Sequence, residues 1–373
     1  MGEMVLKDLR AENRARVFRE IREARVISSP DLSKTLDLSR PTVTQNLKEL
    51  LDSGVIYENG LDATNGGRRA RTYSVVDNRY AAIGVDVTKN HITVVVVNLC
   101  AEIIYHKRIR RRFFWDEVFQ REFGTLIREA VTETRLTAEQ VLGVGVTLPA
   151  LVTDDHQRVF YGNILGITGM EASYFAAEVP YPVLLFNDAN AAGYAEISVR
   201  PELNDAFYIS LSNNIGGSVL IDHKVYTGQD SHSGEIGHMT IYPDGKLCYC
   251  GQQGCFETCC NATVLDQYFD GNLEEFFKAL QVGDAQCQRI WKQYINDLAI
   301  AVNNLRMLFD SPVILGGYVG AYLEPYMGEL RQLALQRNPF DHNADYLLAC
   351  RVKKDSLAFG SALHFVHHLW ENI

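Results

Sequence analysis

A short segment of the chain carries four residues of the types that bind metal ions. His238 is followed by Cys248, Cys250 and Cys255, so one imidazole and three thiols lie close together in the sequence. This combination suits tetrahedral Zn(II), and glycines beside the cysteines would let the loop fold tightly round one ion. Because four protein ligands would leave no position for water, we predict a structural zinc site.

Two alternatives remain open for this segment, a disulfide pair or unliganded thiols. The charged N-terminal sequence lacks the apolar segment of a signal peptide, and no apolar run reaches the length of a membrane span. We therefore expect a cytoplasmic protein with no membrane partner, in which cysteines stay reduced and a disulfide is disfavoured. The other cysteines are expected to be buried thiols, namely Cys100, Cys259, Cys260, Cys287 and Cys350.

The charge of the chain is divided unevenly. The formal net charge is −10, yet residues 1–80 carry 14 Lys and Arg against 12 Asp and Glu, a net of +2. The remaining residues carry 22 against 34, a net of −12. A basic end on an acidic body indicates that only the N-terminal part meets a polyanion.

Residues 1–78 are predicted to form a winged helix-turn-helix domain. Apolar residues at helical spacing predict a first helix over 12–25, Ser29 is the expected N-cap of a second, and Ser39 that of a third. Two strands around a basic loop follow, and this succession is typical of a DNA-binding domain. The alternative is a helical hairpin that binds protein.

The predicted DNA contacts come from the third helix and the loop after it. Polar side chains that face outward from the helix can bond to base edges, and arginines of the wing can bond to phosphates. The residues concerned are Ser39, Arg40, Thr42, Thr44, Gln45, Asn46, Lys48, Arg68, Arg69 and Arg71.

The pattern changes after Tyr80 to strands joined by short turns, with helices between them. Two strand-rich openings, each followed by helices, predict a duplicated α/β body with a cleft between two lobes. We expect the first lobe over 79–200 and the second over 201–354. A C-terminal helix at about 355–373 is expected to return to the first lobe.

These motifs together resemble the ROK family (repressor, open reading frame, kinase). The histidine and three cysteines resemble the signature in which that family holds zinc. The resemblance covers essentially the whole chain and implies an actin-like ATPase fold after the winged helix-turn-helix. With that domain in front, the chain is similar to the family's sugar-responsive repressors, such as those for xylose and N-acetylglucosamine. The resemblance implies operator DNA as a partner and a homodimer or homotetramer.

The resemblance also implies a sugar site. Asn187 and Asp188 follow a predicted strand, at the end where α/β clefts collect ligands, and in ROK kinases the matching residues bind the sugar and act as the base. A helix cap is the alternative for this pair. The residues that match sugar contacts are Asn163, Asn187, Asp188, Glu235, His238 and Glu257.

The turns that would hold ATP phosphates depart from the ROK kinase pattern. The first turn, 86–90, has no glycine, the second, 212–218, keeps two, and Tyr318 stands where a third glycine is usual after Gly316 and Gly317. Side chains would fill the space that phosphates need. The sequence therefore predicts a regulator rather than an enzyme. The alternatives are an active sugar kinase with a DNA-binding segment, and a DNA-binding protein whose body only dimerises.

Overall fold

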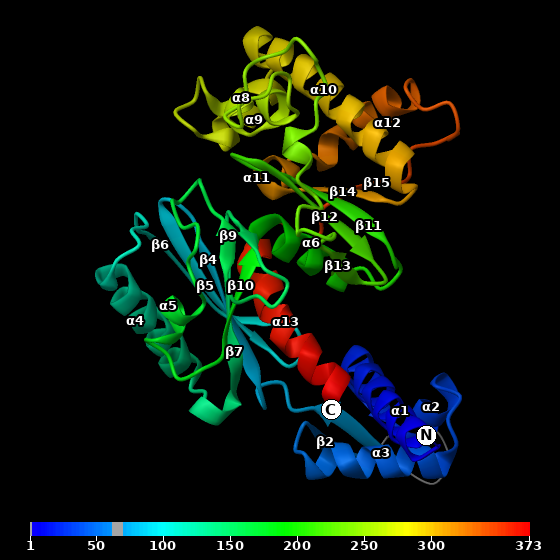
Figure 1. Ribbon diagram of the computed structural model, residues 1–373. Helices are drawn as coiled ribbons and strands as arrows, with labels where there is room; N and C mark the ends of the chain where they lie inside the picture. The colour runs from blue at the N-terminus through cyan, green and yellow to red at the C-terminus, as the bar shows by residue number, and fades with distance from the viewer. Residues whose placement is uncertain (1, 62–69) are drawn as a thin grey trace.

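The computed structural model describes residues 2–61 and 70–373 and divides them into three parts (Figure 1). A small N-terminal domain lies at one end, and two α/β lobes, each built on a five-stranded sheet, follow it. The predicted fold class, a winged helix-turn-helix followed by a two-lobed α/β body, is confirmed in the described residues.

The N-terminal domain packs three helices against a small antiparallel sheet. Its elements are α1 Gly2–Ala24, β1 Ile27–Ser28, α2 Ser29–Thr35, α3 Arg40–Asp52, β2 Ile56–Leu61 and β3 Arg71–Val75, with the strand order β1-β3-β2. Phe18 and Ile21 of α1 are fully buried with Leu50 of α3, as the helical spacing predicts. The wing between β2 and β3, with Arg68 and Arg69, lies outside the described residues.

The N-caps of α2 and α3 set the turn between them. Ser39 Oγ accepts the Thr42 N–H at 3.3 Å, as predicted for α3. The predicted cap of α2 is wrong by one residue. Ser28, which is extended at the end of β1, accepts the Asp31 N–H, and Ser29 is already helical.

The first lobe is built on a mixed sheet in the order β10-β7-β4-β5-β6. The strands are β4 Ala81–Val87, β5 His91–Asn98, β6 Ile103–Arg110, β7 Val141–Leu148 and β10 Val183–Asn187. Helix α4, Glu117–Thr134, packs on one face together with α5, Ser173–Ala176. The short strands β8 Leu151–Val152 and β9 Val159–Tyr161 pair with each other, and Leu151 and Tyr161 line a cavity.

The second lobe repeats the strand pattern of the first. Its sheet has the order β13-β12-β11-β14-β15, and in both lobes three antiparallel strands are extended by two parallel ones. The strands are β11 Ala206–Leu211, β12 Ile215–Ile221, β13 Lys224–Tyr226, β14 Val313–Gly316 and β15 Leu347–Ala349. The helices are α7 Glu257–Cys260, α8 Thr263–Asp266, α9 Leu273–Gln281, α10 Ala285–Phe309, α11 Gly317–Gly320 and α12 Met327–Leu335.

Two helices join the three parts. Helix α6, Asp188–Ser198, begins at the end of β10 but packs on β11 and β12 of the second lobe. Helix α13, Ser356–Asn372, packs on β4 and β7 of the first lobe, on α6 and on α1. A Cβ at Gly360 would lie 1.8 Å from the carbonyl oxygen of Ala191, so the backbones of α13 and α6 are in direct contact.

Among the described residues, no helix has both the length and the apolar composition needed to cross a bilayer.

Candidate metal centre and interlobe cavity

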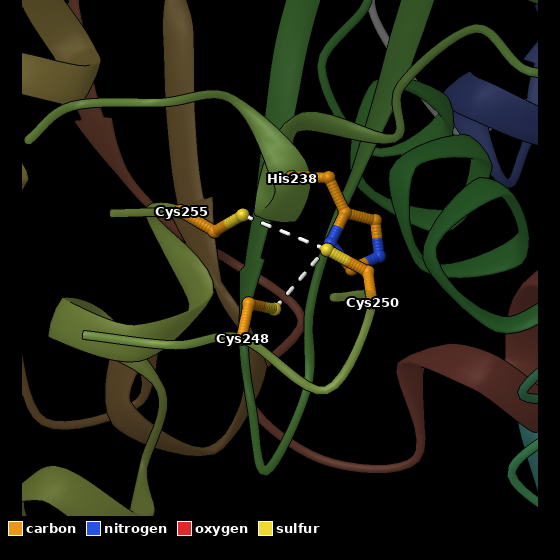
Figure 2. Close-up of side chains that lie close together, drawn as sticks. All are labelled: His238, Cys248, Cys250 and Cys255. Carbon is orange, nitrogen blue, oxygen red and sulfur yellow. Dashed lines mark hydrogen bonds between the residues drawn. The ribbon is translucent and has the colours of Figure 1, made fainter. Parts of the chain in front are cut away.

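The four predicted metal ligands come together in the structure. One ligand atom from each of His238, Cys248, Cys250 and Cys255 lies within 4.8 Å of every other (Figure 2). Cys250 Sγ is 3.7 Å from Cys255 Sγ, and Cys248 Sγ is 3.8 Å from His238 Nδ1. This cluster could hold a metal ion, and the described cysteines form no disulfide.

The loop that carries the cysteines is shaped by close backbone contacts. Gly251 and Gly254 have φ values of 91° and 72°, which side chains with a Cβ rarely adopt. A Cβ at Gly254 would also lie 1.4 Å from the Tyr242 carbonyl oxygen. The Cys248 N–H donates to the Gln252 carbonyl at 2.8 Å and closes the turn. The glycines thus allow the tight turns that bring the sulfurs of Cys248, Cys250 and Cys255 close together.

The other cysteines are separate from the cluster. The prediction of burial is correct for Cys100, Cys260, Cys287 and Cys350, while Cys259 is only half-buried.

His238 belongs to the metal cluster and to a cavity between the lobes. Its Nδ1 faces the cysteine sulfurs, and its Nε2 lies 3.4 Å from the Tyr249 hydroxyl. His238 and Tyr249 both line a cavity of about 80 Å³. This cavity has room for several water molecules.

Five of the six residues predicted to contact sugar line this cavity. They are Asn163, Asn187, Asp188, Glu235 and His238. Asn163 comes from the loop after β9, Asn187 and Asp188 from the junction of β10 and α6, and the other two from the turn after β13. Residues far apart in the sequence therefore converge at the end of the first lobe's parallel strands.

Asn187 both caps a helix and lines the cavity. Its Oδ1 accepts the Asn190 N–H at 2.9 Å, and its Nδ2 donates to the Ala150 carbonyl at 3.1 Å. The alternative interpretation as a cap is therefore correct for Asn187. Asp188 opens α6, and its Oδ1 accepts only the Ala189 N–H, at 2.8 Å, among its described neighbours. Asp188 has oxygen lone pairs left for a ligand.

The carboxyl groups of the cavity are crowded. Burial raises the pKa of Asp188 to about 6, although the hydrogen bond from Ala189 acts in the opposite direction. Burial raises the pKa of Glu235 to about 7, and the nearby Asp188 and Glu257 carboxylates add to the shift. A ligand that donates hydroxyl hydrogen bonds would relieve the loss of hydration.

Glu257 is not among the described residues that line this cavity, and its contact with sugar stays a prediction. It is 3% exposed, and its Oε2 accepts the Ile215 N–H at 2.6 Å while Oε1 accepts from Asn261 Nδ2 at 3.3 Å. Both oxygens already have protein partners, so Glu257 holds the start of β12 against the cysteine loop.

Sequence reasoning missed several residues of the cavity wall. Tyr249, Asn214 and Tyr161 line it beside the predicted residues. Tyr161 accepts a hydrogen bond from Asn163 Nδ2 at 2.8 Å. Tyr249 had a signal in the sequence because it lies between two of the predicted metal-ligand cysteines, and Asn214 had one because it lies in the 212–218 turn.

The outer face of α3 presents four of the predicted DNA contacts. Arg40, Thr44, Gln45 and Lys48 are exposed on this helix. The prediction that Asn46 faces outward is wrong. Asn46 is 5% exposed, and its Nδ2 donates to the Thr42 carbonyl at 2.8 Å, one turn back along the helix.

The other predicted DNA contacts flank this face. Ser39 is exposed and Thr42 half-buried, and their hydroxyls lie 2.8 Å apart at the start of the helix. Arg71 is exposed at the start of β3 and pairs with Glu58 at 3.0 Å.

Of the predicted nucleotide turns, the 212–218 turn borders the cavity through Asn214 and Gly216, whereas the 316–318 turn is packed against the protein. The Gly317 N–H donates to the Tyr208 hydroxyl at 3.1 Å, and the Tyr318 N–H donates to Ser212 Oγ at 3.3 Å. A Cβ at Gly316 would lie 2.3 Å from the Tyr208 hydroxyl. The remaining glycines of this turn are therefore required for packing.

The fold and the site together define a two-lobed α/β protein with a helix-turn-helix domain and a histidine and three cysteines beside its cleft. The profile of the ROK family matches residues 82–364, and that of a helix-turn-helix domain matches residues 10–57. The chain belongs to the ROK family, as its sequence motifs predict.

Curated relatives of the chain include a repressor and a dual regulator of transcription. The xylose repressor of Caldicellulosiruptor bescii is 26% identical over 354 residues, which cover 88% of this chain and 89% of that protein. The DNA-binding transcriptional dual regulator NagC of Escherichia coli is 23% identical over 259 residues, 68% of this chain and 64% of that regulator.

Solved structures share the fold. A ROK family transcriptional regulator described as a homolog of the E. coli MLC protein superposes with a TM-score of 0.76, at 21% identity and 98% coverage of both chains. A ROK hexokinase from Thermus thermophilus has a TM-score of 0.64 at 24% identity, with 78% of this chain and 99% of that one covered. The body is thus common to regulators and kinases.

Proposed function

We propose that this protein is a sugar-responsive DNA-binding transcriptional repressor. The observation that carries the proposal is that an exposed polar helix face and a carboxylate-lined interlobe cavity occur in one chain, joined by α13. The names of the relatives, a xylose repressor and a DNA-binding transcriptional regulator, support the same interpretation.

Zn(II) is the metal that fits the cysteine cluster, and its role is structural. Zn–S bonds of about 2.3 Å in a tetrahedron place two sulfurs about 3.8 Å apart, and Cys250 and Cys255 are separated by 3.7 Å. The ion would tie the loop to His238. With Nδ1 as the metal ligand, the neutral imidazole would carry its proton on Nε2, which faces the cavity.

Sugar recognition rests on hydrogen bonds in fixed directions. Asp188 and Glu235 accept from hydroxyls, His238 Nε2 donates, and Asn163 offers an amide. Glu257 acts as a positioning residue through Ile215. The present cavity is smaller than a typical ligand pocket, so binding requires the lobes or the Tyr249 loop to move.

ATP use is disfavoured because two backbone donors of the 316–318 turn already have protein partners. Phosphates bind to backbone N–H groups that glycine turns expose, and here Tyr208 and Ser212 accept the two N–H groups of the 316–318 turn. Asp188 would be the base if the protein were a kinase. The kinase alternative therefore needs a rearrangement of this turn.

A continuous packed path connects the cavity to the DNA-binding helix. Helix α6 starts at Asp188, α13 packs on α6, and the Arg22 guanidinium stacks 3.7 Å from the Trp370 ring of α13. Arg14 of α1 donates to the Ile373 carbonyl and also pairs with Glu49 of α3 at 2.5 Å. Movement of α6 on sugar binding would therefore reach α3.

The operator would be a palindrome bound by a homodimer, or by two dimers in a homotetramer. Arg40, Thr44, Gln45 and Lys48 would read bases and phosphates, with Ser39, Thr42 and Arg71 beside them. Arg68 and Arg69 of the wing complete the proposed set. Replacing Gln45 with Ala is expected to weaken operator binding by about 1–3 kcal/mol without lowering the melting temperature.

The first test measures the melting temperature of the full chain with D-xylose, D-glucose and N-acetylglucosamine. The same measurement is made with the 5-phosphate of xylose and the 6-phosphates of the two hexoses. A ligand at about 100 times its Kd adds roughly 2.7 kcal/mol of stability. The sugar that stabilises the protein should also release it from duplex DNA selected in vitro for binding. A stabilising sugar that leaves DNA binding unchanged would contradict the repressor mechanism.

A further inference from the structure

A second cavity lies where the DNA-binding domain meets both lobes. Its volume is about 750 Å³, within the range of small-molecule sites. Arg19 and Arg22 of α1, the loop 151–156 of the first lobe, residues 222–225 of the second lobe and the C-terminal half of α13 all line it. The DNA-binding domain, both lobes and α13 therefore all border this one cavity.

This cavity is separate from the cavity beside the metal cluster. Leu151 and Asn187 are in the walls of both. The Asn187 side chain is held by Ala150 and by Asn190, so it forms part of the partition between them. None of the metal cluster residues lines the larger cavity.

The inner wall of this cavity consists largely of rings. The His156 and Phe186 centroids are 4.5 Å apart, those of Phe186 and His364 are 5.0 Å apart, and those of His156 and His364 are 5.2 Å apart. Trp370 lies deeper along α13 and is 8% exposed. Ring faces of this kind bind a flat or ring-shaped ligand.

Two imidazoles of this wall are uncharged near neutral pH. Burial lowers the pKa of His364 to about 4 and that of His367 to about 3, and Arg22 adds to the shift of His367. His367 Nδ1 shares a hydrogen bond of 2.6 Å with the Tyr194 hydroxyl. A neutral polar wall favours a neutral ligand, because an ion would lose hydration without gaining a counter-charge.

One polar atom of the wall is buried without a partner in the described chain. Asn190 Oδ1 accepts no hydrogen bond. Buried acceptors are normally paired, so a ligand with hydroxyl or N–H donors fits here. Charged side chains of both signs also line the cavity, three basic and four acidic, namely Arg19, Arg22, Lys224, Glu23, Asp154, Asp222 and Glu371.

We propose that this cavity is a second effector site, for a neutral molecule with a ring and hydroxyl or amide N–H donors, of the size of an aryl glycoside or a nucleoside. Because α1 forms one wall, an occupant contacts the DNA-binding domain and both lobes at once. Binding there is coupled to operator binding, and the coupling is reciprocal.

The experiment uses the full chain, with phenyl β-D-glucopyranoside and adenosine as separate probes in calorimetric titrations. We expect one of the two probes to bind with a stoichiometry of one molecule per chain. The probe that binds then shows whether the natural ligand resembles an aryl glycoside or a nucleoside. Asn190→Leu removes the unpaired acceptor at similar volume, and His364→Phe keeps the ring but removes its nitrogens. Each variant should weaken binding at least tenfold.

The matched control is Asn303→Leu. Asn303 carries another buried side-chain oxygen without a partner in the described chain, but it lies in α10 and does not line this cavity. The control should keep the probe affinity of the natural chain. Asp188→Ala should keep it as well, which separates this site from the proposed sugar cavity.

The outcomes decide between the alternatives. If neither probe binds, or if the bound probe has the same Kd in Asn190→Leu, His364→Phe and Asn303→Leu, the second site is rejected. A probe whose Kd changes at least threefold when operator DNA is added supports the coupling, and an unchanged Kd rejects it. Loss of probe binding in Asp188→Ala would assign the probe to the sugar cavity.

Discussion

The two sides of the interlobe cleft differ in what their polar groups are free to do. On the side of the metal cluster, Asp188 and Glu235 point into a cavity with few protein partners. On the opposite side, Tyr208 and Ser212 already accept the N–H groups that a phosphate would need. In the same two-lobed body, the sugar side of the cleft can therefore remain open for ligand binding while the 316–318 turn on the phosphate side is packed against the protein.

Tyr318, in the 316–318 turn, illustrates the difference between the two sides of the cleft. Burial raises the pKa of its hydroxyl, and the neighbouring carboxylates of Asp86 and Asp188 add to the shift against the opposing effect of Arg108. The ring thus stands close to the two carboxylates of the cleft. A sensor that binds sugar without ATP needs free polar groups on the sugar side of the cleft but not on the phosphate side.

The largest expected effect is that of Asp188→Ala on sugar binding. The carboxylate would accept hydrogen bonds from hydroxyls in a half-buried site, so its removal should cost about 3 kcal/mol, roughly 100-fold in affinity. Calorimetry with the sugar identified by the melting scan measures this loss. Operator affinity without sugar should not change, and Asp244→Ala, which removes an exposed carboxylate of the second lobe, is the control.

Loss of the metal should have the next largest effect. Cys250→Ser removes one ligand, and sugar affinity is expected to fall about 10–100-fold because His238 and the Tyr249 loop lose their anchor. Elemental analysis should find one zinc per chain in the natural protein and less in the variant. Cys259→Ser, outside the cluster, should retain both zinc and affinity. A natural protein without zinc would contradict this part of the proposal.

The coupling path should respond to a change that touches neither ligand. Arg14→Ala breaks the links from α1 to Ile373 and to Glu49. Sugar binding should persist, whereas the amount by which sugar weakens operator binding should fall by about 0.5–2 kcal/mol. Gel-shift titrations with and without sugar measure this coupling, and an unchanged ratio would rule out the path through α1.

The nucleotide side should show a smaller, pH-dependent effect on stability. Burial, together with Asp188, raises the pKa of Asp86 from 3.8 to about 7. Since the folded protein holds this proton more tightly than the unfolded chain, the cost of ionising Asp86 is absent below about pH 4 and complete above pH 7. Asp86→Asn should therefore stabilise the protein by about 1–2 kcal/mol at pH 8.

Thermal unfolding at two pH values tests the prediction for Asp86. The gain from Asp86→Asn should nearly vanish at pH values close to the ordinary pKa of aspartate. The exposed Asp345→Asn serves as the control and should change neither curve. A gain that is the same at both pH values would show that ionisation of Asp86 is not its cause.

The smallest expected effect is that of Mg-ATP. Because the donors of the 316–318 turn are already used, Mg-ATP should leave the melting temperature and the sugar affinity unchanged. An increase of several degrees, of the size that binding at about 100 times Kd produces, would instead support the kinase alternative. Sugar-dependent release of ADP would have the same meaning.

Several features of this protein followed from the sequence alone. The histidine and three cysteines predict a cluster that could hold a metal ion, because few other uses require four such ligands at short spacing. Ser39 and Pro41 mark the start of α3 because a cap and a proline act within one helical turn. The alternation of strands and helices after Tyr80 gave the two-lobed α/β body.

Only the tertiary structure decided which polar groups are free. Glu257, at the start of α7, accepts a hydrogen bond from the Ile215 N–H at the start of β12, 42 residues away in the sequence. His156, Phe186 and His364 meet although more than 200 residues separate the first from the last. Local patterns encode caps and buried faces, but a hydrogen-bond partner or a cavity depends on contacts between distant segments.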